Sequence, residues 1–184
     1  MDAILHLVQG ETEGVTTPQN ELQAFLTSAA AERLAIIQRH EASARVVSHY
    51  DFNNAYQYVI SREETHLSWL QNALAEFAAQ LPAASPVLPE PQAPKKGKTM
   101  EPGVFKSILD EDARGLGDFV QRWRPRVAEM THARHRNMMN VILGESLEHQ
   151  RLFEQAASGF EDVLGKRTDG AARVGEVLPT RWME

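Results

Sequence analysis

Hydrophobic residues recur at steps of three and four along four stretches of this chain, which predicts four amphipathic helices. The first runs from Thr17-Pro18, an N-cap followed by proline at the first helical position, to about Val47. A turn at residues 48–51 follows, and Asp51 is expected to cap the second helix. The second helix shows the clearest face, made of Tyr56, Val59, Glu63, His66, Leu70, Ala73 and Phe77.

The third helix is predicted to begin near Gly103 and to end or kink at Pro125, with a turn near residues 127–131. The fourth helix is predicted to end near Leu164-Gly165. The third face consists of Phe105, Leu109, Asp112, Leu116, Phe119 and Trp123. The fourth face consists of Met138, Ile142, Glu145, His149, Leu152 and Ala156.

Residues 81–102 contain six prolines, a density that excludes a helix and favours an extended path. Such a segment suits a crossover along a bundle. We therefore predict an all-α fold, an antiparallel four-helix bundle of two helical hairpins over residues 17–165. Residues 1–16 form an N-terminal arm and 166–184 a loose tail. The alternative is a separate pair of hairpins that serves as a dimerisation module.

The composition of the 184-residue chain excludes several kinds of site and partner. The chain has no cysteine, which excludes disulfides and every cysteine-based metal site. Its net charge of −6 gives no reason to expect a nucleic-acid partner. No apolar run approaches the roughly 18 residues of a membrane span, and the N-terminus lacks the features of a signal peptide. We expect a cytoplasmic protein with no membrane partner.

Acidic side chains interrupt each of the four apolar faces. Burying an unpaired carboxylate is costly, and four together would repel one another. Two divalent cations would neutralise four carboxylates, and two imidazoles would complete the ligands. The candidate metal-ligating residues are Glu32, Glu63, His66, Asp112, Glu145 and His149.

The two halves of the chain also match in order. Glu32 precedes Glu63 by 31 residues and Asp112 precedes Glu145 by 33, so a hairpin returns each pair to about the same height. A Glu-x-x-His motif preceded by an acidic residue about thirty positions earlier, and repeated in a second hairpin, resembles the ferritin-like di-iron carboxylate superfamily, in particular its rubrerythrin- and bacterioferritin-type members.

The resemblance implies two iron ions, with manganese as a possible substitute. Glu63 and Glu145 would bridge them, and Glu32 and His66 would be terminal ligands. Oxidation of Fe(II) by O₂ or peroxide would follow, in a ferroxidase or peroxidase type of reaction. An external protein would donate electrons because the chain has no cysteine for a rubredoxin-type centre. A homodimer is expected, since ferritin-like chains commonly pair.

At two ligand positions the sequence departs from the motif, and each position has two candidate residues. The third helix offers Glu111 or Asp112, and the fourth offers Glu148 or His149. The alternative function is a metal-free ferritin-like bundle that acts as a binding or scaffold protein. In that case Arg33, Arg62 or Arg114 should turn inward and pair with the acids. His40 is expected to be a hydrogen-bonded interior histidine.

Overall fold

The computed structural model describes residues 18–92 and 101–165, so the predicted arm, the cap at Thr17 and the tail lie outside the described residues. These ranges contain helices and no strand, which confirms the all-α prediction. The elements are α1 (Pro18–Val46), α2 (Tyr50–Ala75), the 3₁₀ helix η1 (Pro102–Phe105), α3 (Lys106–Ala128) and α4 (Ala133–Ala157).

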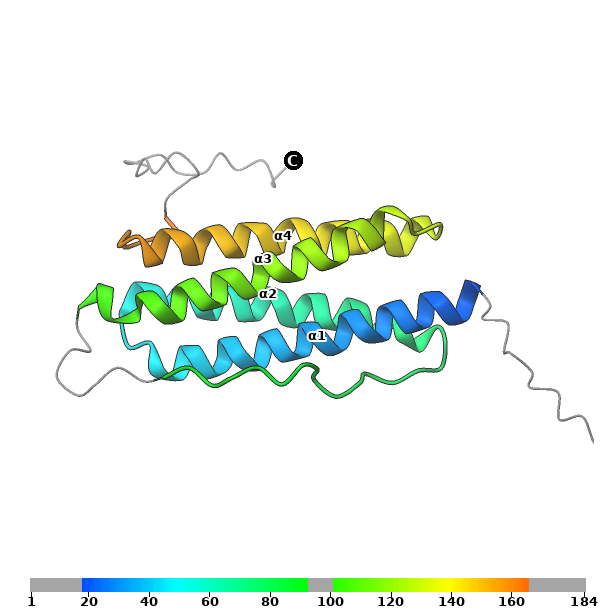
Figure 1. Ribbon diagram of the computed structural model, residues 1–184, viewed down its shortest axis with the longest axis horizontal. Helices are drawn as coiled ribbons and strands as arrows, with labels where there is room; N and C mark the ends of the chain where they lie inside the picture. The colour runs from blue at the N-terminus through cyan, green and yellow to red at the C-terminus, as the bar shows by residue number, and fades with distance from the viewer. Residues whose placement is uncertain (1–17, 93–100, 166–184) are drawn as a thin grey trace, which may run out of the picture.

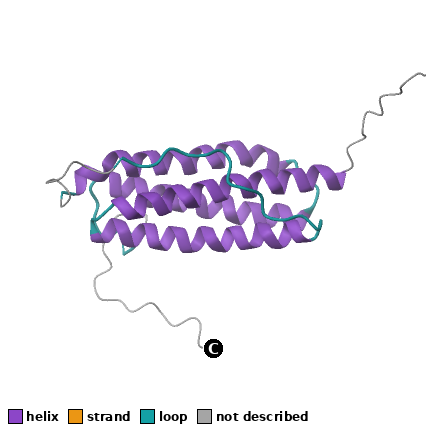
Figure 2. Cartoon of the chain, turned by 90° about the horizontal axis from the view of Figure 1, so that it is seen from below, coloured by secondary structure: helices purple, strands orange, loops and turns teal. Residues whose placement is uncertain are grey.

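The four helices lie side by side as an elongated helical bundle (Figures 1 and 2). α1 packs against α2 and α3, and α4 packs against the same two neighbours from the other side. The helices of each pair, α1 with α2 and α3 with α4, run in opposite directions (Figure 1). The described part of the segment after α2, residues 76–92, returns along the molecule beside α1, and α2 and α3 run the same way (Figure 1).

The segment that follows α2, residues 76–92, is hydrogen-bonded to α1 at two places. The Ser85 backbone N–H donates to the carbonyl oxygen of Ala31 at 3.0 Å, and the Arg39 guanidinium donates to the carbonyl oxygen of Pro89. Between these points Leu88 packs against the hydrophobic core. The segment therefore covers the side of the bundle formed by α1 and α3.

The hydrophobic core runs through all four helices and includes most of the apolar positions that periodicity selected. Six of the largest fully buried side chains are aromatic residues from α2, η1, α3 and α4, each of which contributes about 1.5–3 kcal/mol by leaving water. They are Phe52, Tyr56, Phe105, Phe119, Trp123 and Phe153.

Two predicted boundaries in the first half need correction. α2 begins at Tyr50 with His49 as N-cap, so Asp51 lies in the first turn and does not cap the helix. A carboxylate there still favours the helix because it faces the positive end of the helix dipole. α2 also ends at Ala75, earlier than its apolar pattern suggests, and Ala78 follows with a φ of 53°.

The second half differs from prediction at three boundaries. α3 follows a 3₁₀ turn and starts at Lys106, not Gly103, and it continues through Pro125 to Ala128. In the last turn, the guanidinium of Arg126 lies over the ring of Trp123 at 4.5 Å, a favourable cation–π distance. α4 stops at Ala157 because Gly159 adopts a φ of 87°, the left-handed conformation that ends helices.

Candidate functional site

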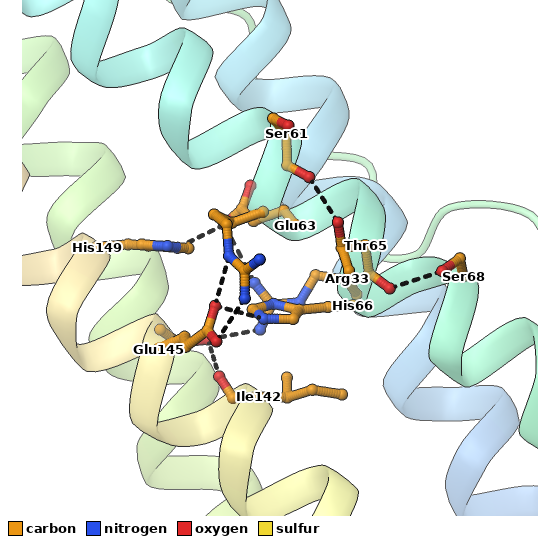
Figure 3. A network of polar contacts seen from close by, with 11 residues as sticks. Arg33, Ser61, Glu63, Thr65, His66, Ser68, Ile142, Glu145 and His149 are labelled. Atoms are coloured by element: carbon orange, nitrogen blue, oxygen red, sulfur yellow. Dashed lines mark hydrogen bonds and ion pairs between the residues drawn. The ribbon is translucent and has the colours of Figure 1, made fainter. Parts of the chain in front are cut away.

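Arg33 of α1 lies in the interior of the bundle, where it joins three helices. One terminal nitrogen donates to Glu63 Oε1 on α2 at 3.1 Å. The other donates to the Ser146 hydroxyl oxygen on α4 at 2.6 Å. Figure 3 shows Arg33, Glu63, His66, Glu145 and His149 turned toward one another, and we call these five residues with Ser146 the interior cluster.

The Arg33 side chain is fully buried, and its charge is compensated from two directions. Its guanidinium carbon lies 4.2 Å from the centre of the Phe119 ring on α3, a favourable cation–π distance. Burial lowers the pKa of Arg33, while the negative charges of Glu63 and Glu32 act to raise it. Since an arginine pKa starts above about 12, the group stays charged. A fixed positive charge therefore occupies the bundle interior.

Glu63 is fully buried as well and has both oxygens occupied. Oε1 accepts from Arg33, and Oε2 lies 2.8 Å from Nδ1 of His40. Burial alone would raise the pKa of Glu63, but His40, His149 and Arg33 lower it well below its usual range. Burial is the largest influence on His40 and lowers its pKa, but the charge and hydrogen bond of Glu63 together with the charge of Asp112 outweigh burial, so the pKa of His40 is raised. The expectation that His40 is a hydrogen-bonded interior histidine is confirmed.

Glu145 lies at the edge of the interior cluster, partly exposed. The Arg62 guanidinium of α2 donates two hydrogen bonds to the Glu145 carboxylate, at 3.0 and 2.7 Å. His66 Nε2 lies 3.0 Å from Oε2 of Glu145. The hydrogen bond from Arg62 is the largest cause of the lowered pKa of Glu145. This carboxylate is therefore neutralised by an arginine from the neighbouring helix.

In each of the two histidines of the interior cluster, one ring nitrogen makes no hydrogen bond within the described residues. The rings of His66 and His149 are stacked with centres 6.2 Å apart. The Nδ1 atoms of both rings are buried and have no hydrogen-bond partner in the part of the chain that the structure describes. His149 Nδ1 lies 3.9 Å from Glu63 Oε1, beyond hydrogen-bonding distance.

The two remaining predicted ligands lie in separate clusters. Glu32 accepts a hydrogen bond from Arg122 and another, of 2.8 Å, from the indole N–H of Trp123. Asp112 accepts from Arg39 at 2.8 Å and from the Tyr56 hydroxyl at 2.5 Å.

Glu111 also pairs with Arg39, at 2.9 Å, and is half-exposed. Glu148, the other open alternative, is exposed and pairs with Arg151. The six predicted ligands therefore lie in three places. Four of them are together in the interior cluster, namely Glu63, His66, Glu145 and His149. Glu32 and Asp112 each lie in a separate cluster.

The side chains in this arrangement do not fit a centre of two metal ions. Each of the four predicted carboxylates is paired with a guanidinium, so none of them needs a cation for neutralisation. Within residues 18–92 and 101–165, no three histidine or acidic side chains are grouped so that they hold a metal ion. Within the interior cluster, the Nδ1 atoms of His66 and His149 accept no hydrogen bond and are still able to bind a metal ion.

Sequence reasoning missed Ser146, and the spacing of the motif contained the signal. Ser146-x-x-His149 has the same spacing as Glu63-x-x-His66, so Ser146 is the counterpart of Glu63 in the second half. Ser146 is fully buried whereas the Glu145 side chain is 30% exposed. A serine with an arginine beside it thus stands where the repeated motif expects a second buried carboxylate.

The pH dependence of stability tests the environment of His66. Burial, followed by the charge of Arg33, lowers the pKa of His66 to about 4. In the unfolded chain it is about 6.5, so the unfolded state binds a proton first as pH falls through this interval, and stability is lost. His66→Gln should remove about 2 kcal/mol of the loss between pH 7 and pH 4.5, measured by urea unfolding. An unchanged pH dependence in the variant would contradict this environment.

Comparisons with known proteins identify no relative. No family model matches the chain, and no match was found among curated proteins or solved structures. Among the helices of residues 18–92 and 101–165, none combines the length and the hydrophobicity of a membrane-spanning segment.

Proposed function

We propose that this chain is a ferritin-like four-helix bundle whose interior is closed by arginine–carboxylate pairs in place of metal ions. We further propose that it acts as a binding or scaffold protein. The observation that carries this proposal is the position of Arg33, a buried guanidinium bonded to both Glu63 and Ser146.

The order and direction of the helices support the ferritin-like part of the proposal. Two hairpins are joined by a segment that runs back along the molecule, so the second and third helices point the same way (Figure 1). A single long crossover of this kind is the connection typical of ferritin-like folds. The Glu63-x-x-His66 motif also faces inward from the second helix, with both side chains buried.

The charge of Arg33 supports the metal-free part of the proposal. A dication about 4 Å from a guanidinium would be repelled by about 8 kcal/mol at the effective dielectric constant usual for protein sites. Arg33 is held by two hydrogen bonds and a ring contact, so it has no route to withdraw without breaking them. Of the three arginines expected to turn inward and pair with the acids in a metal-free protein, Arg33 does so, and Arg62 pairs with Glu145 at the partly exposed edge of the interior cluster.

A second candidate function is the di-iron chemistry that the sequence resemblance implies, oxidation of Fe(II) by O₂ or peroxide. One observation favours it, the two unpartnered Nδ1 atoms of His66 and His149. This candidate requires Arg33 to leave Glu63, and it requires ligands to replace Glu32 and Asp112, which lie in other clusters.

The thermal stability of the wild-type protein with and without metal distinguishes the two candidates. A metal that binds only the folded state raises the melting temperature, by about 5 to 10 °C at a hundredfold excess over its dissociation constant for a protein of this size. We expect no rise with Mn(II) in air or with Fe(II) under anaerobic conditions, and no stoichiometric iron or manganese in the purified protein. A rise of that size that His149→Ala abolishes would overturn the metal-free proposal.

A further inference from the structure

One end of the bundle carries a groove that runs across the start of α1. The end of α2 and the turn between α3 and α4 lie at the same end (Figure 1). One cavity of about 480 Å³ lies between α1 and the end of α2, and another of about 460 Å³ lies between α1 and the end of α3. Both are lined by Gln19, Leu22 and His132, so we call the two cavities together the end groove. Each has the volume of a typical ligand pocket, which is room for several side chains.

The part of the end groove toward α3 has an apolar lining. Leu22 and Phe25 of α1 and Met130, which follows α3, contribute to it. Leu22 and Met130 are only partly buried against the core. The guanidinium of Arg126 lies over the Phe25 ring at 5.0 Å. An apolar segment placed here would remove from water the surface that Leu22 and Met130 still expose.

The part of the end groove toward α2 contains a buried polar atom without a partner. His135 of α4 is 1% exposed and lines this cavity, and its Nδ1 lies 2.8 Å from Nδ1 of His132. Its Nε2 has no hydrogen-bond partner within residues 18–92 and 101–165. Glu76 Oε2 lies 3.5 Å from this nitrogen, too far for a good hydrogen bond. Buried polar atoms in proteins almost always have a partner, so the end groove offers a polar contact as well as apolar ones.

The chain has an apolar segment attached at the edge of the end groove. α1 begins at Pro18, which lines the groove, and residues 1–17 precede it. Residues 3–8, Ala-Ile-Leu-His-Leu-Val, are hydrophobic at five of six positions, and we call them the apolar run. The nine residues between the run and Pro18 can extend to about 30 Å. Residues 18–25 of α1 span only about 10 Å, so the run can reach every part of the groove.

We propose that the apolar run folds back and docks in the end groove. Its aliphatic side chains then cover Leu22, Phe25 and Met130. One of its backbone groups hydrogen-bonds to Nε2 of His135. The contact lies at the end of the bundle, apart from the interior cluster, and it goes beyond the proposed binding or scaffold role without resting on it.

The point of attachment selects the apolar run over other occupants. A short link gives the run an effective concentration in the millimolar range, so a separate molecule must bind tightly to displace it. The C-terminal tail begins beyond the far end of α4 (Figure 1). The 25 residues of α4 span about 37 Å, and the tail would have to return over that length to reach the groove.

Disulfide cross-linking tests the contact, because the chain has no cysteine of its own. His6→Cys places a thiol in the apolar run without removing an aliphatic side chain, and Gln23→Cys places a second thiol in the wall of the end groove. We expect this pair to form a disulfide within one chain under mild oxidation. Adding Ile4→Asp and Leu7→Asp should slow the reaction about tenfold or more, because charged side chains are costly to bury in an apolar groove.

Thr12→Asp with Thr16→Asp is the matched control, because it adds the same charge to the same segment outside the apolar run. It should leave the rate of cross-linking unchanged. Without the added cysteines, Ile4→Asp with Leu7→Asp should lower the melting temperature by about 3 to 6 °C, and the control should not.

Equal rates of cross-linking in the apolar-run variant and the control overturn the proposal. A disulfide that joins two chains, seen by mass spectrometry, overturns it in favour of a second copy as the occupant. The interior cluster takes no part in these measurements, so failure here leaves the metal-free proposal untouched.

Discussion

Replacement of Arg33 by methionine is expected to lower the free energy of unfolding by about 3 to 5 kcal/mol, measured by urea denaturation at pH 7. Methionine has a similar length, but it leaves Glu63 with no guanidinium in a fully buried position. The hydroxyl of Ser146 also loses the donor that it faces at 2.6 Å. The cost is that of an uncompensated buried charge, which is far larger than the loss of an exposed pair.

Two further variants show whether this cost comes from the buried charge. Arg151→Met removes an exposed partner of Glu148 and should cost at most about 0.5 kcal/mol. Adding Glu63→Gln to Arg33→Met removes the charge that was left alone and should restore at least half of the lost stability. If the double variant is no more stable than Arg33→Met, the charge of Glu63 is not what Arg33 compensates.

Conversion of Arg33 and Ser146 to glutamate is expected to create a metal-binding protein. The double variant places two new carboxylates beside Glu63, with the free Nδ1 atoms of His66 and His149 close by. Carboxylate and imidazole ligands suit Mn(II) and Fe(II). Without metal the three acids repel one another and the variant should be less stable than wild type. With a hundredfold excess of Mn(II) over its dissociation constant, its melting temperature should rise by about 5 to 10 °C.

The control for this conversion is the pair Arg33→Gln with Ser146→Gln, which has nearly the same shape and no added charge. It should show no response to Mn(II). A glutamate variant that is folded, by circular dichroism, and whose melting temperature does not respond to Mn(II) would contradict the expectation that carboxylates at these two positions create a metal site. The same conclusion would follow if the glutamine variant responded equally.

The helices were predictable because their signal is distributed over many positions. Along η1 and α3, the predicted face from Phe105 to Trp123, Asp112 included, recurs at steps of three and four, and every residue of it is buried. A single wrong residue does not disturb such a pattern. The ends are less predictable, since a boundary such as the stop of α4 near Gly159 depends on the backbone conformation of one residue.

The site was less predictable because it depends on single side chains at the margin of a helical face. Adjacent residues on a helix differ in direction by about 100°. Glu32 and Arg33 both border the buried stripe of α1, and the structure sends Arg33 toward α2 and α4 and Glu32 toward α3. On α4, either Glu145 or Ser146 could likewise face the interior of the bundle. The buried stripe there passes through Met139, Ile142, Ser146, His149 and Phe153.

The pairing of charges between helices also limits which arrangements of the chain are possible. Arg33, Arg39 and Arg62 each bind an acid on another helix, at sequence separations of 30, 73 and 83 residues. Sliding one helix along its neighbour by a single turn, about 5.4 Å, would separate these partners, and for Arg33 and Arg39 it would leave unpaired charges in an apolar interior. A core of leucine and alanine alone would tolerate such a slip far better. The interhelical arginine–carboxylate pairs therefore specify the register of the helices, because they stabilise one alignment and make the shifted ones less stable.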